Sequence, residues 1–238
     1  MNPSLSDHRR KFLRKALTLS LAAMPGAWWA ATPASAVAAG KDDQQDEIPP
    51  TEDLMREHGL LNRILLIYEE HLRRLHAHQD FDPAVLASAA EVIHRFVEDY
   101  HEKLEEEHLF PRFRKAGKMV DLVDTLLAQH QAGRRVTDEV QRLSNAAAMK
   151  DGSQRDRLAS QLQVFVRMYR PHEAREDTIL FPAFRTLVSG HEFGALGEDF
   201  ERKENQLFGH QGFETMVARV AELEKRLGIY DLAQFTPA

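Results

Sequence analysis

From about residue 50 onward, apolar residues recur in steps of three and four, which is the spacing of one face of an α-helix. The first such row also contains a histidine, and its members are Leu54, His58, Leu61, Leu65, Tyr68, Leu72 and Leu75. Thr51 precedes the row and is followed by acidic residues, as is typical of a helix N-cap and first turn. The pattern therefore predicts an amphipathic helix that starts near Thr51.

Three further stretches repeat this pattern. After a turn at Asp80, a second helix is predicted from Pro83 to about Arg114. A third is predicted over roughly residues 119–145, with an inward row of Val123, Leu126, His130, Gly133, Thr137 and Val140. A fourth follows the break MKDGSQ, with an inward row of Leu158, Leu162, Phe165, Tyr169, His172, Glu176 and Ile179. Since glycine and proline are sparse here, we predict an all-α fold, an up-down-up-down four-helix bundle over residues 51–187.

One histidine interrupts the apolar row of each predicted helix, and the four are His58, His101, His130 and His172. A single buried histidine is more often hydrogen-bonded in a core than bound to a metal. Four of them each need a partner that offsets desolvation. In an alternating bundle, all four lie within about 10 to 20 Å of the same end at about 1.5 Å per residue. The pattern thus predicts one layer of four imidazoles.

A repeated phrase adds two carboxylates to that layer. HEKLEEEHLFPRFR begins at His101 and HEAREDTILFPAFR begins at His172, 71 positions later. Each copy places a glutamate four residues after its histidine, Glu105 or Glu176, on the same helix face. A buried carboxylate is costly unless it is paired or bound to a cation. Six such ligands exceed the four of a structural zinc site and suit two first-row ions, each with two histidines, bridged by both glutamates.

Composition narrows the chemistry further. The chain has 238 residues, a formal net charge of −6 and no cysteine. The missing cysteine excludes disulfides and thiolate ligands, so the nitrogen and oxygen donors favour iron or manganese, with zinc as a further alternative. The acidic balance, without a long basic run after the first fifteen residues, argues against a nucleic-acid partner.

The first 36 residues have the features of a signal peptide: a basic start, an apolar middle and the small-residue ending Ala34-Ser35-Ala36. His8 to Arg14 is similar to the twin-arginine export motif but departs from it at both of those positions. We therefore expect the twin-arginine export machinery as a partner, cleavage near Ala36, and a periplasmic protein without stable membrane insertion. The alternative is an uncleaved signal that anchors the chain. Residues 37–50 are predicted to be a polar linker.

At this point the residues 51–187 resemble the hemerythrin-like domains, the histidine-histidine-glutamate cation-binding bundles. The resemblance implies that the metal ligands are His58, His101, Glu105, His130, His172 and Glu176. It also implies two iron ions, joined by an oxo or hydroxo bridge. The stretch from Phe193 to the end resembles the C-terminal extension often attached to these domains. We expect residues 188–238 to form that extension, with one further amphipathic helix that ends at Gly228 and packs on the bundle.

One position departs from the oxygen-carrying members of that family, which have a second histidine four residues after the third-helix ligand. This chain has Arg134 there. Either the guanidinium lies near the pocket and favours anionic ligands, or it turns outward to water. Four other side chains were considered as extra ligands or as hydrogen-bond partners of the ligands, namely Glu102, His94, His108 and Tyr169. Three acids are expected on a solvated face, namely Glu106, Glu107 and Asp177.

These features predict a non-haem di-iron protein of the cell envelope that binds iron and a small ligand such as O2, NO or peroxide. Carriage, sensing, and protection against oxidative or nitrosative stress share this set of ligands, so the sequence leaves them open. The alternatives are a di-iron oxidase, peroxidase or ferroxidase, and a metal-free structural bundle. We expect a binding protein rather than a dedicated enzyme, and no catalytic residue is assigned.

Overall fold

The computed structural model describes residues 48–237, and these form helices joined by short turns, with no strand among them. The predicted signal peptide and most of the predicted linker lie outside the described residues. The first helix, α2, spans Pro50–His76. Its N-cap is Pro49, so Thr51 is a buried residue of the first turn and not the predicted cap. Proline suits this start because the first helical N–H groups have no partner within the helix.

The second rod runs without interruption from Pro83 to Ala116. Asp82 caps it by accepting a hydrogen bond from the backbone N–H of Ala84, and Gly117 ends it with a positive φ of 62°. Two of its five segments, η2 and η3, are π-helical. The segments are α3 (Pro83–Val92), η2 (Ile93–His101), α4 (Glu102–Leu104), η3 (Glu105–Leu109) and α5 (Phe110–Ala116).

The third and fourth rods complete the set of long helices. The third is α6 (Val120–Leu143), and the short η4 (Ala148–Lys150) follows it. Asp151 caps the fourth rod by accepting hydrogen bonds from the N–H groups of Ser153 and Gln154. This rod consists of α7 (Gly152–Arg175), the π-helical η5 (Glu176–Leu180) and α8 (Phe181–Leu187).

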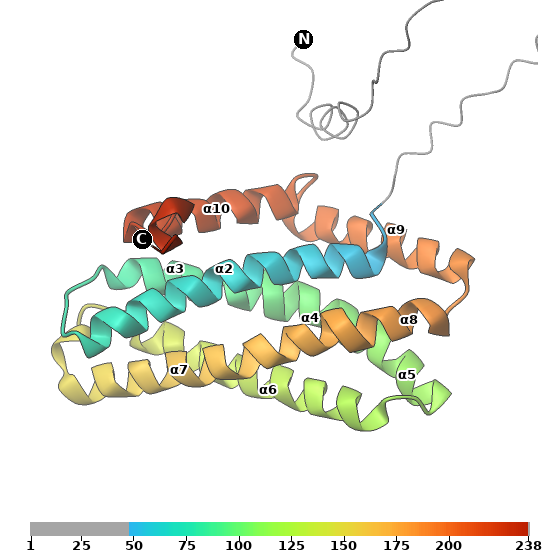
Figure 1. The fold of residues 1–238 in the computed structure, drawn as a ribbon, viewed down its shortest axis with the longest axis horizontal. Helices are drawn as coiled ribbons and strands as arrows, with labels where there is room; N and C mark the ends of the chain where they lie inside the picture. Colours follow the sequence, from blue (N-terminus) through green and yellow to red (C-terminus); the bar gives the residue numbers. More distant parts are fainter. Residues whose placement is uncertain (1–47, 238) are drawn as a thin grey trace, which may run out of the picture. The chain divides into compact units, whose positions relative to one another are not determined.

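Each long rod packs against at least two others, and together the rods enclose a common apolar core. α2 contacts α7 and the second rod, and α6 also contacts α7 and the second rod. Figure 1 shows these four rods lying side by side. Aromatic side chains from three of the rods, Tyr68, Phe96 and Phe165, are fully buried between them. Burying such apolar surface is the main favourable contribution to folding.

One predicted core position is wrong, and the π-helical turns explain why. Ile179 was assigned to the inward row from α-helical spacing, yet its side chain is 45% exposed, and Leu180 is buried instead. In the π-helical η5, backbone hydrogen bonds reach five residues back, so each turn contains an extra residue. The inward position therefore moves one residue along the chain. η3 occupies the equivalent place in the first copy of the repeated phrase.

The extension forms two helices and not the single one expected. They are α9 (Gly190–Phe208) and α10 (Gly212–Leu227), separated at Gly209, whose φ is 80°. α10 ends at Gly228 in the left-handed conformation, where glycine has no steric penalty. α10 packs on α2 and α3, and α9 packs on α2, so the extension covers one side of the bundle. A one-turn helix, η6 (Leu232–Phe235), follows.

Within residues 48–237, none of the helices combines the length and the apolar character needed to cross a lipid bilayer.

Candidate metal centre

The six side chains predicted as ligands lie together between the four rods. α2 supplies one of them, the second rod two, α6 one and the fourth rod two. Each side chain is at most 4% exposed, and the residues are His58, His101, Glu105, His130, His172 and Glu176.

The four imidazoles form two pairs in which the Nε2 atoms face each other. The Nε2 atoms of His58 and His101 are 3.1 Å apart, and those of His130 and His172 are 3.2 Å apart. Each pair joins one odd-numbered rod of the bundle to one even-numbered rod.

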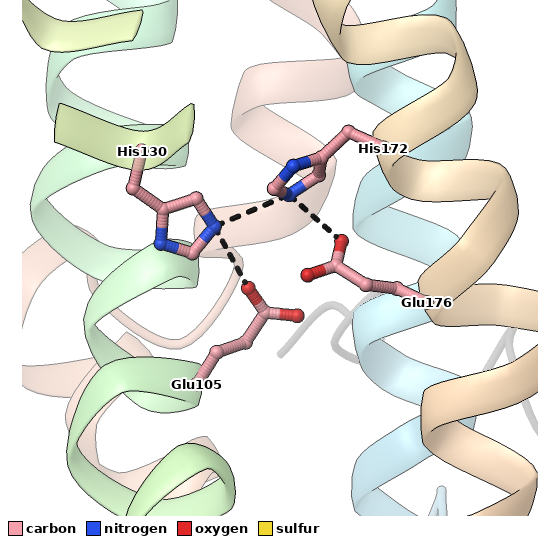
Figure 2. A group of neighbouring side chains, drawn as sticks. All are labelled: Glu105, His130, His172 and Glu176. Carbon is pink, nitrogen blue, oxygen red and sulfur yellow. Dashed lines mark hydrogen bonds and ion pairs between the residues drawn. The ribbon is translucent and has the colours of Figure 1, made fainter. Parts of the chain in front are cut away.

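The two glutamates lie between the histidine pairs, and each glutamate contacts one histidine of each pair. Glu105 places Oε1 3.9 Å from Nε2 of His101 and Oε2 3.4 Å from Nε2 of His130. Glu176 places Oε2 3.4 Å from Nε2 of His58 and 3.1 Å from Nε2 of His172. Figure 2 shows both carboxylates directed at the His130–His172 pair. Both carboxylate oxygens of Glu105 and both of Glu176 are buried without a hydrogen-bond partner.

The other nitrogen of every imidazole has a partner of its own. Nδ1 of His58 lies 2.7 Å from Asp177, and Nδ1 of His101 lies 2.7 Å from Glu57. The corresponding partners in the second pair are Glu106 for His130, at 3.2 Å, and Gln129 for His172, at 2.8 Å. Because carboxylate and amide oxygens accept, each Nδ1–H donates. In a neutral imidazole this leaves the Nε2 lone pair directed into the pocket.

Without a bound cation, burial and neighbouring like charges destabilise the charged forms of some of the pocket's carboxylates and imidazoles. Burial raises the pKa of Glu105 well above its usual value, and the carboxylate of Glu176 raises it further. Burial lowers the pKa of His101 well below its usual value, and the neighbouring His58 lowers it further. For His58, burial acts to lower the pKa, but Asp177 and Glu176 outweigh it and raise the pKa to about 10. A bound cation would stabilise the carboxylates and the inward lone pairs together.

Arg134 points inward, which decides between its two predicted orientations. Its side chain is 27% exposed, and its guanidinium lies 2.7 Å from Glu102 and 2.8 Å from Glu106. Glu102 also accepts a hydrogen bond of 2.7 Å from the hydroxyl of Tyr169. Burial raises the pKa of Glu102 to about 8. These side chains form a polar layer beside the His130–His172 pair.

Gly133 is required by the position of Tyr169. A Cβ atom on Gly133 would lie 2.0 Å from the Tyr169 hydroxyl oxygen, far inside contact distance. The glycine therefore permits the ring to reach Glu102, and it explains why the inward row of the third helix contains no side chain at this level.

Two of the additional candidates lie elsewhere. His94 is 45% exposed and contacts Glu98 and Asp99. The half-buried ring of His108 packs on Phe200 of the extension. The ligand clusters formed by the described residues contain neither histidine.

Sequence reasoning missed the partners of the Nδ1 atoms. Glu106 and Asp177 were expected on a solvated face, but each binds a histidine. Glu107 is exposed, as expected, and pairs with Lys203. The other two Nδ1 partners, Glu57 and Gln129, could have been found from the sequence. Each directly precedes a histidine of the site, and the two positions are 72 residues apart.

Comparison with known proteins adds a family and close relatives. The sequence model of the hemerythrin HHE cation binding domain matches residues 50–184. Uncharacterised proteins of Mycobacterium bovis and of two strains of Mycobacterium tuberculosis are each 50% identical to this chain over 196 residues. The match covers 82% of this chain and 77% of each relative. No solved structure shows a significant match.

Proposed function

Because the chain belongs to the hemerythrin HHE cation-binding family, we propose that it holds two iron ions, one at each histidine pair, inside an up-down-up-down four-helix bundle. A small ligand such as O2, NO or peroxide binds at the same centre. One observation carries the proposal: two pairs of buried imidazoles direct Nε2 atoms at each other while every Nδ1 is already hydrogen-bonded.

The distances fit metal ligation. Two nitrogen ligands about 2.1 Å from one ion and at right angles to each other lie about 3.0 Å apart. The Nε2 separations are 3.1 and 3.2 Å, close to that value. The unpartnered oxygens of Glu105 and Glu176 add donors for both ions. Nitrogen and oxygen donors without thiolate suit iron or manganese.

The protein residues hold and shield this centre. Glu105 and Glu176 each lie between a histidine of one pair and a histidine of the other, so the charge of each carboxylate acts on both pairs. The phenyl ring of Phe181 stacks on His58, and that of Phe110 stacks on His130. These phenylalanines belong to the Leu-Phe-Pro part of the repeated phrase, and they exclude water from one face of each pair.

Iron held there supplies a redox-active ion with coordination positions left open for a small ligand. The hydrogen bonds to Nδ1 fix the orientation of each imidazole and raise its strength as a donor. Arg134 offsets the charge of Glu106 and Glu102, so an anionic ligand is repelled less at the second pair than at the first.

Quantitative metal analysis of the purified protein tests the proposal. After anaerobic loading with Fe²⁺, we expect about two irons per chain, and optical spectra that change when O2 or NO is added. His130→Ala and His101→Ala should each remove iron and abolish the spectral change. Fewer than one bound ion per chain would contradict the di-iron assignment. Unchanged melting of both variants, with no metal in the parent protein, would support a metal-free bundle.

The proposal includes export to the cell envelope, and the amino-terminal sequence supports it. Arg9 and Arg10 occupy the paired-arginine positions, and Ala34-Ser35-Ala36 forms the cleavage signal. Replacing both arginines by lysine keeps the charge and should retain the full-length chain inside the cell. Fractionation and mass measurement of the mature chain test this, and equal periplasmic amounts of both forms would contradict it.

A further inference from the structure

A buried histidine lies outside the centre, near the other end of α2. His71 is 0% exposed, and its Nδ1–H donates a hydrogen bond of 2.8 Å to the backbone carbonyl of Ile67. Its Nε2 atom is buried without a hydrogen-bond partner. A neutral imidazole tolerates this arrangement, because only a lone pair is left without a partner. A protonated imidazole would bury a charged N–H without an acceptor, which costs more free energy.

A side chain that packs on His71 belongs to a short turn. Residues 77–82 join α2 to α3, and the ring of Phe81 lies edge-on to the imidazole, with 4.8 Å between the ring centroids and 84° between the ring planes. Phe81 is partly exposed. His78 in the same turn has a φ of 52°, which residues with a side chain rarely adopt. Movement of this turn would therefore remove Phe81 from His71 without unfolding a long helix.

Both carboxylates that act on His71 are already paired with arginines. Glu70 on α2 pairs with Arg74 at 2.6 Å, and Asp82 at the end of the turn pairs with Arg226 of α10 at 2.6 Å. Burial, helped by the charge of Arg74, lowers the pKa of His71 to about 4, against the opposite effects of the Nδ1 hydrogen bond and the two carboxylates. An imidazolium at this position would therefore have to reach water.

Two contacts join this end of the bundle to the extension. The guanidinium of Arg74 donates to the backbone carbonyl of Leu227 at 2.7 Å, and that of Arg226 donates to Asp82. α10 also packs on α2 and α3. A turn that moves away from His71 carries Asp82 with it and so separates Asp82 from Arg226.

We propose that His71 and residues 77–82 form an acid-sensitive latch, in which protonation of His71 opens the turn and releases the C-terminal end of α10 from the bundle. Nε2 of the imidazolium gains water when Phe81 moves away, and the pair of Asp82 with Arg226 is lost in the same movement. His71 follows His58 by 13 residues, or about 20 Å along the helix, so the latch does not depend on a bound metal.

The direction of the pH dependence follows from the chemistry of a buried base. The closed form keeps His71 neutral down to about pH 4, whereas the open form takes up a proton near the ordinary pKa of 6.5. The stability of the closed turn is therefore fully present above about pH 6.5 and is lost as the pH falls toward 4. The equilibrium constant for opening should rise roughly 10- to 30-fold between about pH 7.5 and about pH 5.

Amide hydrogen exchange of the iron-loaded full chain tests the latch, with rates corrected for the intrinsic effect of pH. We expect the rise in opening at residues 77–82 and in the last turns of α10. His71→Leu removes the titrating group and should abolish the rise. His76→Gln removes an exposed imidazole from the same end of α2 and should leave the rise unchanged. An equal rise in His71→Leu, or no rise in the parent chain, would overturn the proposal.

A second measurement does not depend on the folding of His71→Leu. The NMR signals of the His71 ring in the parent chain should show a neutral imidazole at about pH 5.5. Phe81→Ala removes the ring that packs on His71, so it should move the titration toward the ordinary pKa of 6.5 and increase exchange of the turn at neutral pH. If His71 titrates near 6.5 in the parent chain while the turn stays protected from exchange, the closed form accommodates the charge and the latch is refuted.

Discussion

The two histidine pairs are built from the same parts in the same order. His58 and His101 belong to the first two rods, and His130 and His172 repeat them 72 and 71 residues later. The acids that follow Glu105 and Glu176 are exchanged between the halves: Asp177 bonds to the first half, and Glu106 bonds to the second. The phenylalanines are exchanged in the same way. Each half of the sequence thus completes the site of the other.

The two halves differ at positions next to the candidate ligands and not at the candidate ligands themselves. Glu57 supports His101, whereas Gln129 supports His172 in the equivalent position. Four residues after the α2 histidine, Asn62 donates to Glu173 at 2.7 Å; the equivalent Arg134 pairs with Glu102. The first pair therefore has two carboxylate partners, and the second has one carboxylate that a guanidinium partly neutralises.

This comparison separates what the ions require from what tunes them. The imidazole donors, the glutamates at Glu105 and Glu176 and the stacked phenyl rings are the same in both halves, as expected if each half holds one ion of the proposed pair. Outer charges differ, and a carboxylate partner makes an imidazole a stronger donor than an amide partner does. We expect a cation to bind more tightly at His58 and His101, and an anionic ligand to bind more tightly beside His130 and His172.

The largest effect on metal affinity should come from replacing the glutamates that both histidine pairs share. Replacing Glu105 or Glu176 by glutamine removes the bridging charge from both pairs, so affinity for both ions should fall by more than the roughly 10- to 100-fold typical of losing an outer partner. Iron content after dialysis measures this. Glu107→Gln changes an exposed acid of the same phrase and should keep full iron content. Loss of only one ion in the bridging variants would contradict shared ligation.

The next largest effect should come from replacing the acid that accepts from a histidine Nδ1, in one half at a time. Asp177→Asn and Glu106→Gln keep an acceptor for Nδ1 but remove its charge, and each should weaken one ion by about 10- to 100-fold. The smaller loss is expected for Glu106→Gln, because Arg134 already offsets part of that charge. Titration with limiting Fe²⁺ measures both. Equal losses would mean that Arg134 does not distinguish the halves.

A third prediction concerns folding and not binding. Gly133→Ala forces a methyl group against Tyr169 and should lower the free energy of unfolding by about 1–3 kcal/mol. Gly59→Ala in α2 has nothing within 4 Å and should raise it by about 0.5–1 kcal/mol through helix propensity. Urea denaturation measures both variants. Adding Tyr169→Phe to Gly133→Ala removes the nearest atom and should recover part of the loss; no recovery would place the strain elsewhere.

The smallest effect should come from Arg134→Asn, which gives the second half the residue that the first half has at the equivalent position, Asn62. Since the guanidinium is partly exposed, we expect azide to bind the iron-loaded protein only a few-fold more weakly, or about 0.5–1 kcal/mol. Optical titration with azide measures the change. Arg134→Lys keeps the charge and should retain most of the affinity. An azide affinity that does not change in either variant would remove Arg134 from ligand binding.

Local periodicity predicted the helices and the six inward side chains well, because both depend on spacing within one rod. The exposure of Ile179 was wrong because π-helical turns change the number of residues per turn, and nothing in the apolar row indicates them. The break at Gly209 was also missed, since an isolated glycine in an amphipathic stretch is compatible with a continuous helix. Both errors concern backbone choices that packing decides.

The sequence alone determined the all-helical class and the composition of the candidate site, because the repeated phrase and the four histidines encode donor types at fixed helical spacing. Only the tertiary structure decided which histidines pair, that Asp177 and Glu106 cross to the opposite half, and that Arg134 turns inward. These contacts join residues from different rods. Their distances depend on how the rods rotate and slide against one another, which no single helical row records.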